Sequence, residues 1–168
     1  MSTVGVVIAV PEPWGSELQS ARAALGDARA YDIPTHITLV PPTEVDADLD
    51  EVEAHLARVA AAHPNFAVLL RGTASFRPVS PVVFVEVAEG ISRCELLAGE
   101  ALGGPLAQRT QFPYHPHVTV AHGVPDGVLD KAAASLEDFS AGFDVTGFDL
   151  YALAGDGWRR RRSFQLTG

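Results

Sequence analysis

The chain has almost no cysteine, since Cys94 is the only one among its 168 residues. A single thiol excludes an internal disulfide and is typical of a protein kept in a reducing compartment. The chain also has no apolar run long enough to cross a membrane, and no basic residue precedes the apolar segment Val4 to Val10. That segment therefore predicts a strand rather than a signal peptide. We expect a cytoplasmic protein without a membrane partner.

Positive charge is scarce as well. Twelve Lys and Arg residues, only one of them Lys, stand against twenty-one Asp and Glu, for a formal net charge of −9. A protein that follows a long nucleic-acid backbone usually needs a basic groove to displace counterions. The charge balance argues against a long duplex as partner and favours a small nucleotide or the phosphate end of an RNA. The apolar content of 47% is sufficient for the core of one domain.

One short pattern occurs twice, as His-Ile-Thr-Leu from His36 and as His-Val-Thr-Val from His117. Polar and apolar residues alternate in both copies, which is the pattern of a strand with one buried face. In each copy the His and Thr side chains share one face, while the two apolar side chains point to the other and can anchor the strand in a core. Pro34 and Pro116 precede the two histidines closely.

A histidine beside a hydroxyl, presented twice, suits the cleavage of a phosphodiester. One imidazole can take a proton from the attacking oxygen while the other gives a proton to the leaving oxygen. The two hydroxyls can hydrogen-bond the phosphate oxygens between them. The same residues would also suit a simpler arrangement, in which the histidines lie at strand ends and the threonines serve β propensity.

The two phrases T-H-I-T-L-V and H-P-H-V-T-V resemble the paired His-x-Thr-x signatures of the 2H phosphoesterase superfamily, in particular its 2′-5′ RNA ligase-like branch. The early apolar strand, Pro41-Pro42 after the first motif and the central F-R-P-V-S-P-V-V-F-V-E-V extend the resemblance over nearly the whole chain. It implies that His36 and His117 are catalytic, that Thr38 and Thr119 bind the phosphate, and that no metal or other cofactor is needed.

Hydrophobic periodicity predicts an alternation of strands and helices. Strands are expected over 4–10, 35–40, 66–76, 82–87 and 118–121, with a closing hairpin of 143–153 and 158–166. Helices are expected over 17–25, 46–63, 91–102 and 128–139. The predicted elements follow the same order at each motif, namely a strand, then a helix, then two strands. This repeated order indicates a duplicated unit. We expect one α+β domain over 1–168, without a linker, whose two pseudo-symmetric lobes are related by an approximate two-fold. The resemblance implies two mainly antiparallel sheets that face a central cleft, with helices on the outside.

The run of four arginines from Arg159 to Arg162 is the densest positive charge. Strand alternation places Arg159 and Arg161 on the face opposite Phe164 and Leu166. If the apolar face packs on helices, the two arginines look into the cleft and can bind phosphate through the planar guanidinium. A charge run that merely faces water is the alternative.

Phe112 and Tyr114 lie just before the second motif and could stack on a base. Packing at a loop is their more ordinary role, and we favour it. His115 and His117 have the spacing of a metal pair, but Pro116 separates them and alternation turns His122 to the opposite face. We therefore expect no metal site.

The residues and the resemblance together predict an enzyme that hydrolyses a nucleotide or RNA-end phosphodiester, above all a 2′,3′-cyclic phosphate. Its partner is then a nucleotide or RNA terminus, and we expect a monomer. We favour His117 as the base that activates water and His36 as the acid. Two alternatives stay open, namely 2′-5′ RNA ligation at the same site and a non-catalytic nucleotide-binding module.

Overall fold

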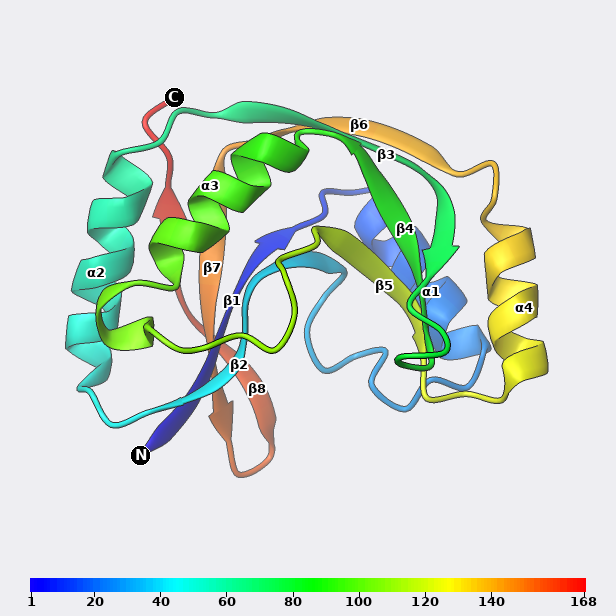
Figure 1. Cartoon of the computed structure of the whole chain (residues 1–168), viewed down its shortest axis with the longest axis horizontal. Helices are drawn as coiled ribbons and strands as arrows, with labels where there is room; N and C mark the ends of the chain where they lie inside the picture. The colour runs from blue at the N-terminus through cyan, green and yellow to red at the C-terminus, as the bar shows by residue number, and fades with distance from the viewer.

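Two antiparallel sheets of four strands form the frame of the protein, and the computed structural model describes all of residues 1–168 (Figure 1). Sheet A has the order β2 (His36–Val45), β1 (Ser2–Ala9), β7 (Gly147–Ala154) and β8 (Gly157–Gln165). Sheet B has the order β5 (His117–His122), β4 (Val82–Glu89), β3 (Phe66–Ser75) and β6 (Ser140–Val145). The two motif strands, β2 and β5, are each an edge strand of their sheet.

Each sheet is covered by two helices. Sheet A contacts α2 (Leu49–Ala61) and α3 (Ile91–Ala101), while sheet B contacts α1 (Trp14–Ala24) and α4 (Asp126–Ser135). In Figure 1 these pairs lie at opposite ends of the molecule, with the sheets between them. A short 3-10 turn, Gly104–Leu106, follows α3. None of the helices has the length and apolar content needed to cross a membrane.

Helix α2 shows how the sequence sets an element. The Asp48 carboxylate caps its first turn by accepting a hydrogen bond from the Asp50 amide at 2.9 Å. Acidic side chains in that turn face the positive end of the helix dipole. Val52, Leu56 and Val59 recur at helical spacing and are buried against sheet A. The helix therefore forms where its cap and its apolar stripe agree.

Burial alternates in the two motif strands as the sequence predicts. In β2 and in β5 alike, the His and Thr residues are partly exposed while the apolar residue after each is fully buried. The buried side chains belong to a core cluster of 34 residues drawn from both sheets and all four helices. The motif strands are thus anchored on one face and open on the other.

The predicted α+β class, with two antiparallel sheets and outer helices, is confirmed. The predicted strand over 143–153 is wrong, because it is two strands that belong to different sheets, β6 and β7. The chain crosses from one sheet to the other at Thr146 and Gly147. A Cβ atom on Gly147 would lie 2.4 Å from the Phe164 carbonyl oxygen, so only glycine allows this close approach.

Candidate active site

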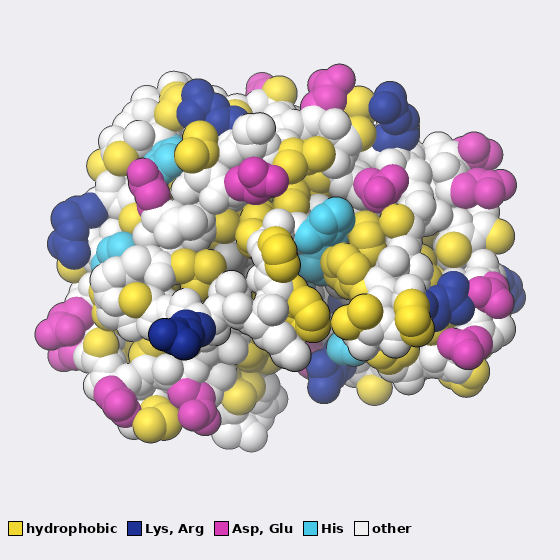
Figure 2. Space-filling view, in the orientation of Figure 1, with side chains coloured by type: hydrophobic (Ala, Val, Ile, Leu, Met, Phe, Trp, Pro, Cys, Tyr) yellow, Lys and Arg dark blue, Asp and Glu magenta, His cyan; other side chains and the backbone are white.

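A cleft of about 540 Å³ lies where the edge strands β2 and β5 meet. His36 and Thr38 enter it from β2, and Thr119 enters it from β5. Figure 2 shows histidine side chains near the middle of one face, in a depression flanked by hydrophobic groups, while acidic and basic groups lie mainly farther out. Folding therefore brings the two motifs, which are about eighty residues apart in the chain, to one place.

The two threonine hydroxyls are available for a ligand. The hydroxyl groups of Thr38 and Thr119 form no intramolecular hydrogen bond, although both residues line the cleft. By contrast, Thr35, Thr43 and Thr73 each donate to a backbone carbonyl. A hydroxyl that faces a cleft without a protein partner can donate to a phosphate oxygen.

Both motif histidines are held in the same way. His36 Nδ1 lies 2.8 Å from the Pro34 carbonyl oxygen, and His117 Nδ1 lies 2.7 Å from the His115 carbonyl oxygen. A carbonyl oxygen only accepts, so Nδ1 carries the proton of each neutral ring and donates it. The Nε2 atom of each ring is left to exchange protons. The carbonyl two residues earlier thus sets both the tautomer and the orientation.

Burial disfavours the charged, protonated form of the imidazole in both His36 and His117. It lowers the pKa of His36 from its usual 6.5 to about 4, helped by positive charge on Arg22 and His117 and opposed by the hydrogen bond to the Pro34 carbonyl. Burial also lowers the pKa of His117, against the effect of its bond to the His115 carbonyl. The two rings belong to strands that contact each other, β2 and β5.

His117 itself is not among the residues that line the 540 Å³ cavity. It lies two residues before Thr119 on the same face of β5, against an aromatic wall. The centre of its ring is 4.9 Å from that of Phe76 and 5.3 Å from that of Phe84, and both contacts are edge-on. This wall accounts for the desolvation of His117.

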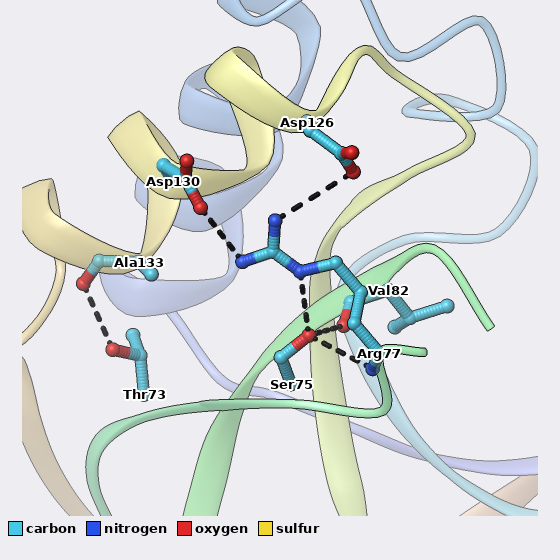
Figure 3. A network of polar contacts seen from close by, with 7 residues as sticks. All are labelled: Thr73, Ser75, Arg77, Val82, Asp126, Asp130 and Ala133. Atoms are coloured by element: carbon cyan, nitrogen blue, oxygen red, sulfur yellow. Dashed lines mark hydrogen bonds and ion pairs between the residues drawn. The ribbon is translucent and has the colours of Figure 1, made fainter. Parts of the chain in front are cut away.

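An ion-pair network fixes the loop that carries Phe76. Figure 3 shows Arg77, in the turn between β3 and β4, reaching the Asp126 and Asp130 carboxylates of α4. The Arg77 guanidinium lies 2.9 Å from Asp130 and 3.7 Å from Asp126. Its Nε and its backbone amide both donate to the Ser75 hydroxyl at 3.1 Å. The aromatic wall is thereby tied to a helix on the far side of sheet B.

Tyr114 has a structural role in this protein. Its hydroxyl donates to the Thr38 carbonyl oxygen at 2.8 Å, and its ring packs against the core cluster. It thus joins the segment before β5 to β2, which supports the packing role that the sequence favours over base stacking. Phe112, in the same segment, is 57% exposed and stays a stacking candidate.

The prediction that Arg159 and Arg161 look into the cleft is wrong, since neither lines it. The pairing of β7 with β8 shifts between Leu150–Arg162 and Tyr151–Arg160, so Arg161 is one extra residue in the strand. Such a β-bulge reverses the alternation on which the prediction depended.

The bulged arginine is used elsewhere. Arg161 donates to Glu53 of α2 at 2.8 Å and to Asp50 at 3.3 Å, and these carboxylates raise the pKa of Arg161. Arg159 pairs with Asp156 in the turn between β7 and β8. The reversal places Trp158 in the cleft instead.

Among the cleft residues that sequence reasoning missed are Arg22, Arg29, His122 and Trp158. A β-bulge also explains the position of His122. Phe84 of β4 pairs with Thr119 and the adjacent Val83 pairs with Ala121, so Val120 is an extra residue in β5. The expected opposite face for His122 is therefore wrong, since the extra residue returns it to the side of Thr119. No group of three or more His, Cys, Asp or Glu side chains is arranged to hold a metal ion.

A family model described as the 2′-5′ RNA ligase superfamily matches residues 10–157. The chain belongs to this superfamily. The resemblance inferred from the two His-x-Thr motifs is thus confirmed.

Relatives match along most of their length. A protein of Geobacillus kaustophilus, named as a candidate phosphoesterase, is 27% identical over 168 residues, which is 98% of this chain and 96% of the relative. A similarly named protein of Bacillus cereus is 28% identical over 152 residues, covering 85% of this chain and 88% of the relative.

Solved structures share the fold. TT0787 of Thermus thermophilus matches with a TM-score of 0.64 at 23% identity, covering 100% of this chain and 99% of its own. Escherichia coli LigT in its apo form matches with a TM-score of 0.68 at 19% identity, covering 99% and 98%. LigT has also been crystallised with NADP+, 3′-AMP, ATP and phosphate. At this identity the likeness shows a common fold.

Proposed function

We propose that this protein is a phosphodiesterase that opens a 2′,3′-cyclic phosphate on a nucleotide or RNA end by acid–base catalysis with two histidines and no metal. One observation carries the proposal. Two His-x-Thr pairs, each with the same exposure pattern and the same Nδ1–carbonyl bond, lie on contacting edge strands. His36, Thr38 and Thr119 line one cleft, and His117 lies two residues before Thr119 on the same face of its strand. Membership of the superfamily and the names of the Geobacillus and Bacillus relatives support it.

The reaction needs one proton accepted and one proton given. A water molecule attacks phosphorus as one Nε2 removes its proton, and the bond from phosphorus to one ribose oxygen breaks as the other Nε2 protonates that oxygen. Thr38 and Thr119 hydrogen-bond the non-bridging phosphate oxygens, whose charge grows in the transition state. The product is a nucleoside phosphate monoester with a free neighbouring hydroxyl.

The surroundings of the histidines favour a division of labour opposite to the one favoured from sequence. His36, with a pKa of about 4, is neutral at pH 7 and ready to accept a proton. Burial aside, the permanent charge of Arg22 acts on His36, whereas the positive group that lowers the pKa of His117 is the His115 ring. We therefore propose His36 as the base and His117, once a phosphate anion stabilises its charged form, as the acid.

Nucleoside 2′,3′-cyclic phosphates test the proposal directly. We expect the wild type to hydrolyse them in the presence of a chelator, and the substitutions His36→Ala and His117→Ala each to lower kcat by about 10²- to 10⁴-fold. His55→Ala is the matched control, because His55 bonds the Ala101 carbonyl far from the cleft and should retain activity. Tight nucleotide binding by the wild type without turnover would instead identify a binding module.

Ligation, which gives the superfamily its name, is the same attack on the cyclic phosphate with a 5′-hydroxyl in place of water, and the bond from phosphorus to the 3′ oxygen breaks. The same two histidines would then join a cyclic phosphate to a 5′-hydroxyl in a 2′-5′ linkage. Incubating an RNA that ends in a cyclic phosphate with an excess of a 5′-hydroxyl oligonucleotide separates the two outcomes. Hydrolysis that exceeds joining at all acceptor concentrations supports the phosphodiesterase.

A further inference from the structure

One end of the cleft is cationic and is not used by the proposed reaction. Arg22 of α1, Arg29 of the loop after α1, and His122 at the end of β5 all line the cavity beside His36. These residues come from three separate segments of the chain. Their convergence on one wall calls for a structural explanation and suggests a binding role.

The buried carboxylate of Asp27 assembles this wall. It is only 5% exposed and accepts a hydrogen bond from Arg22 Nε at 2.6 Å, from the Arg29 amide at 2.9 Å and from the His122 amide at 3.0 Å. Burial opposes its charge, but these bonds outweigh burial and keep the pKa of Asp27 below its usual value. One charged group thus fixes all three segments.

Binding capacity remains after this assembly. The Arg29 guanidinium forms no ion pair, and Arg22 uses only its Nε on Asp27, which leaves its terminal nitrogens. By contrast, Arg77, Arg159 and Arg161 are each paired with carboxylates outside the cleft. Asp32 is the one carboxylate that lines the cavity. Burial is the main cause of the lowered pKa of His36 and of His122. The positive charge of Arg22 lowers the pKa of His36 further, and the charges of Arg29 and Arg22 lower that of His122 further.

We propose that Arg22, Arg29 and His122 form a second anion subsite, which binds a phosphate of the substrate other than the one that is cleaved. Guanidinium groups bind phosphate oxygens through paired, charge-assisted hydrogen bonds. The substrate class is then a nucleotide with two separate phosphates, such as a 2′,3′-cyclic phosphate that also carries a 5′-phosphate. A cavity of about 540 Å³ is in the size range of small-molecule sites. This inference rests on the proposed function for the identity of the first phosphate.

The test compares two substrates that differ by one group, adenosine 2′,3′-cyclic phosphate with a 5′-hydroxyl and with a 5′-phosphate. We expect wild type to prefer the 5′-phosphorylated substrate in kcat/KM by about tenfold or more, and Arg29→Gln to remove most of that preference. Arg93→Gln removes the same charge from an exposed position on α3 and should keep the wild-type preference. Equal losses on both substrates in Arg29→Gln, or no preference in wild type, would overturn the second subsite.

Binding measurements keep this test separate from that of the proposed function. By calorimetry, adenosine 3′,5′-bisphosphate should bind the wild type more tightly than adenosine 3′-monophosphate by about tenfold, and Arg29→Gln should bind the two alike. A protein that turns over neither cyclic substrate but shows this difference refutes the phosphodiesterase and retains the subsite. A protein that turns over both and shows no difference does the reverse.

Discussion

His36 and His117 have the same backbone support and different neighbours. In each, a carbonyl two residues earlier binds Nδ1 and leaves Nε2 to exchange protons. His36 lies near the guanidinium of Arg22, whereas His117 lies against the rings of Phe76 and Phe84. Chemically identical side chains in different surroundings acquire different proton affinities, and this is how one site can hold both an acid and a base.

The choice of acid can be tested with the leaving group. In a nucleoside 4-nitrophenyl phosphodiester the nitrophenolate leaves without being protonated, whereas in the methyl ester the methanol oxygen needs a proton from an acid in order to leave. We expect the loss caused by His117→Ala to shrink by about 10²-fold on the nitrophenyl ester, and the loss caused by His36→Ala to be similar on both esters. Rescue of the His36 variant instead would assign the acid to His36.

The low pKa of His36 also predicts how stability depends on pH. The unfolded chain takes up a proton on this ring below pH 6.5, whereas the folded protein does so only near pH 4. The free energy of unfolding therefore falls as the pH drops through this window, by up to about 2 kcal/mol from this site between pH 7 and pH 5. Urea unfolding of wild type and His36→Gln at both pH values measures it. An identical pH dependence in the two proteins would contradict the shift.

At the scale of elements, single extra residues decide which side chains enter the cleft. The bulge in β5 turns His122 inward, and the bulge in β8 admits Trp158 and gives Arg161 to α2. Gly147 acts at the same scale, because the chain leaves sheet B for sheet A there and passes the Phe164 carbonyl closely.

The crossing at Gly147 gives a prediction for stability. In Gly147→Ala the new Cβ would lie 2.4 Å from a backbone oxygen, so β7 and β8 must move apart. We expect a loss of about 2–3 kcal/mol in the free energy of unfolding, measured by urea denaturation. Gly142→Ala is the control on β6, since its Cβ would meet only the Leu69 side chain at 3.8 Å and should change stability by less than about 1 kcal/mol.

For the whole molecule, the acidic surface and the cationic wall of the cleft work together. The net charge of −9 repels a long polyanion, while Arg22 and Arg29 attract phosphate locally. The cleft is also small compared with a helical nucleic acid. This charge distribution supports the proposal that a nucleotide or a chain end enters one pocket.

This charge distribution predicts weak binding to long RNA. In fluorescence anisotropy at physiological salt, a long RNA duplex should show no saturable binding at protein concentrations that saturate with a short 3′-phosphorylated oligonucleotide. Duplex binding that weakens steeply with added salt would indicate a basic surface track and contradict the prediction.

The local sequence pattern was sufficient to predict the positions of most helices and strands and the buried face of each motif strand. Alternation in the two His-x-Thr phrases fixed which face of β2 and β5 is buried, and caps and apolar stripes located the helices to within a few residues. These features depend on neighbours in the sequence, and so they can be read from it. The motif residues His36, Thr38 and Thr119 accordingly lie where alternation placed them.

Only the tertiary structure decided the rest of the cleft. Whether a strand contains a bulge depends on its partner strand, so alternation failed at Arg159, Arg161 and His122. The switch of sheets at Gly147 depends on Phe164, which is far along the chain. The cationic wall depends on Asp27, a buried carboxylate that bonds groups from α1, from the loop after α1 and from β5. Contacts between distant segments set these positions, and no local pattern records them.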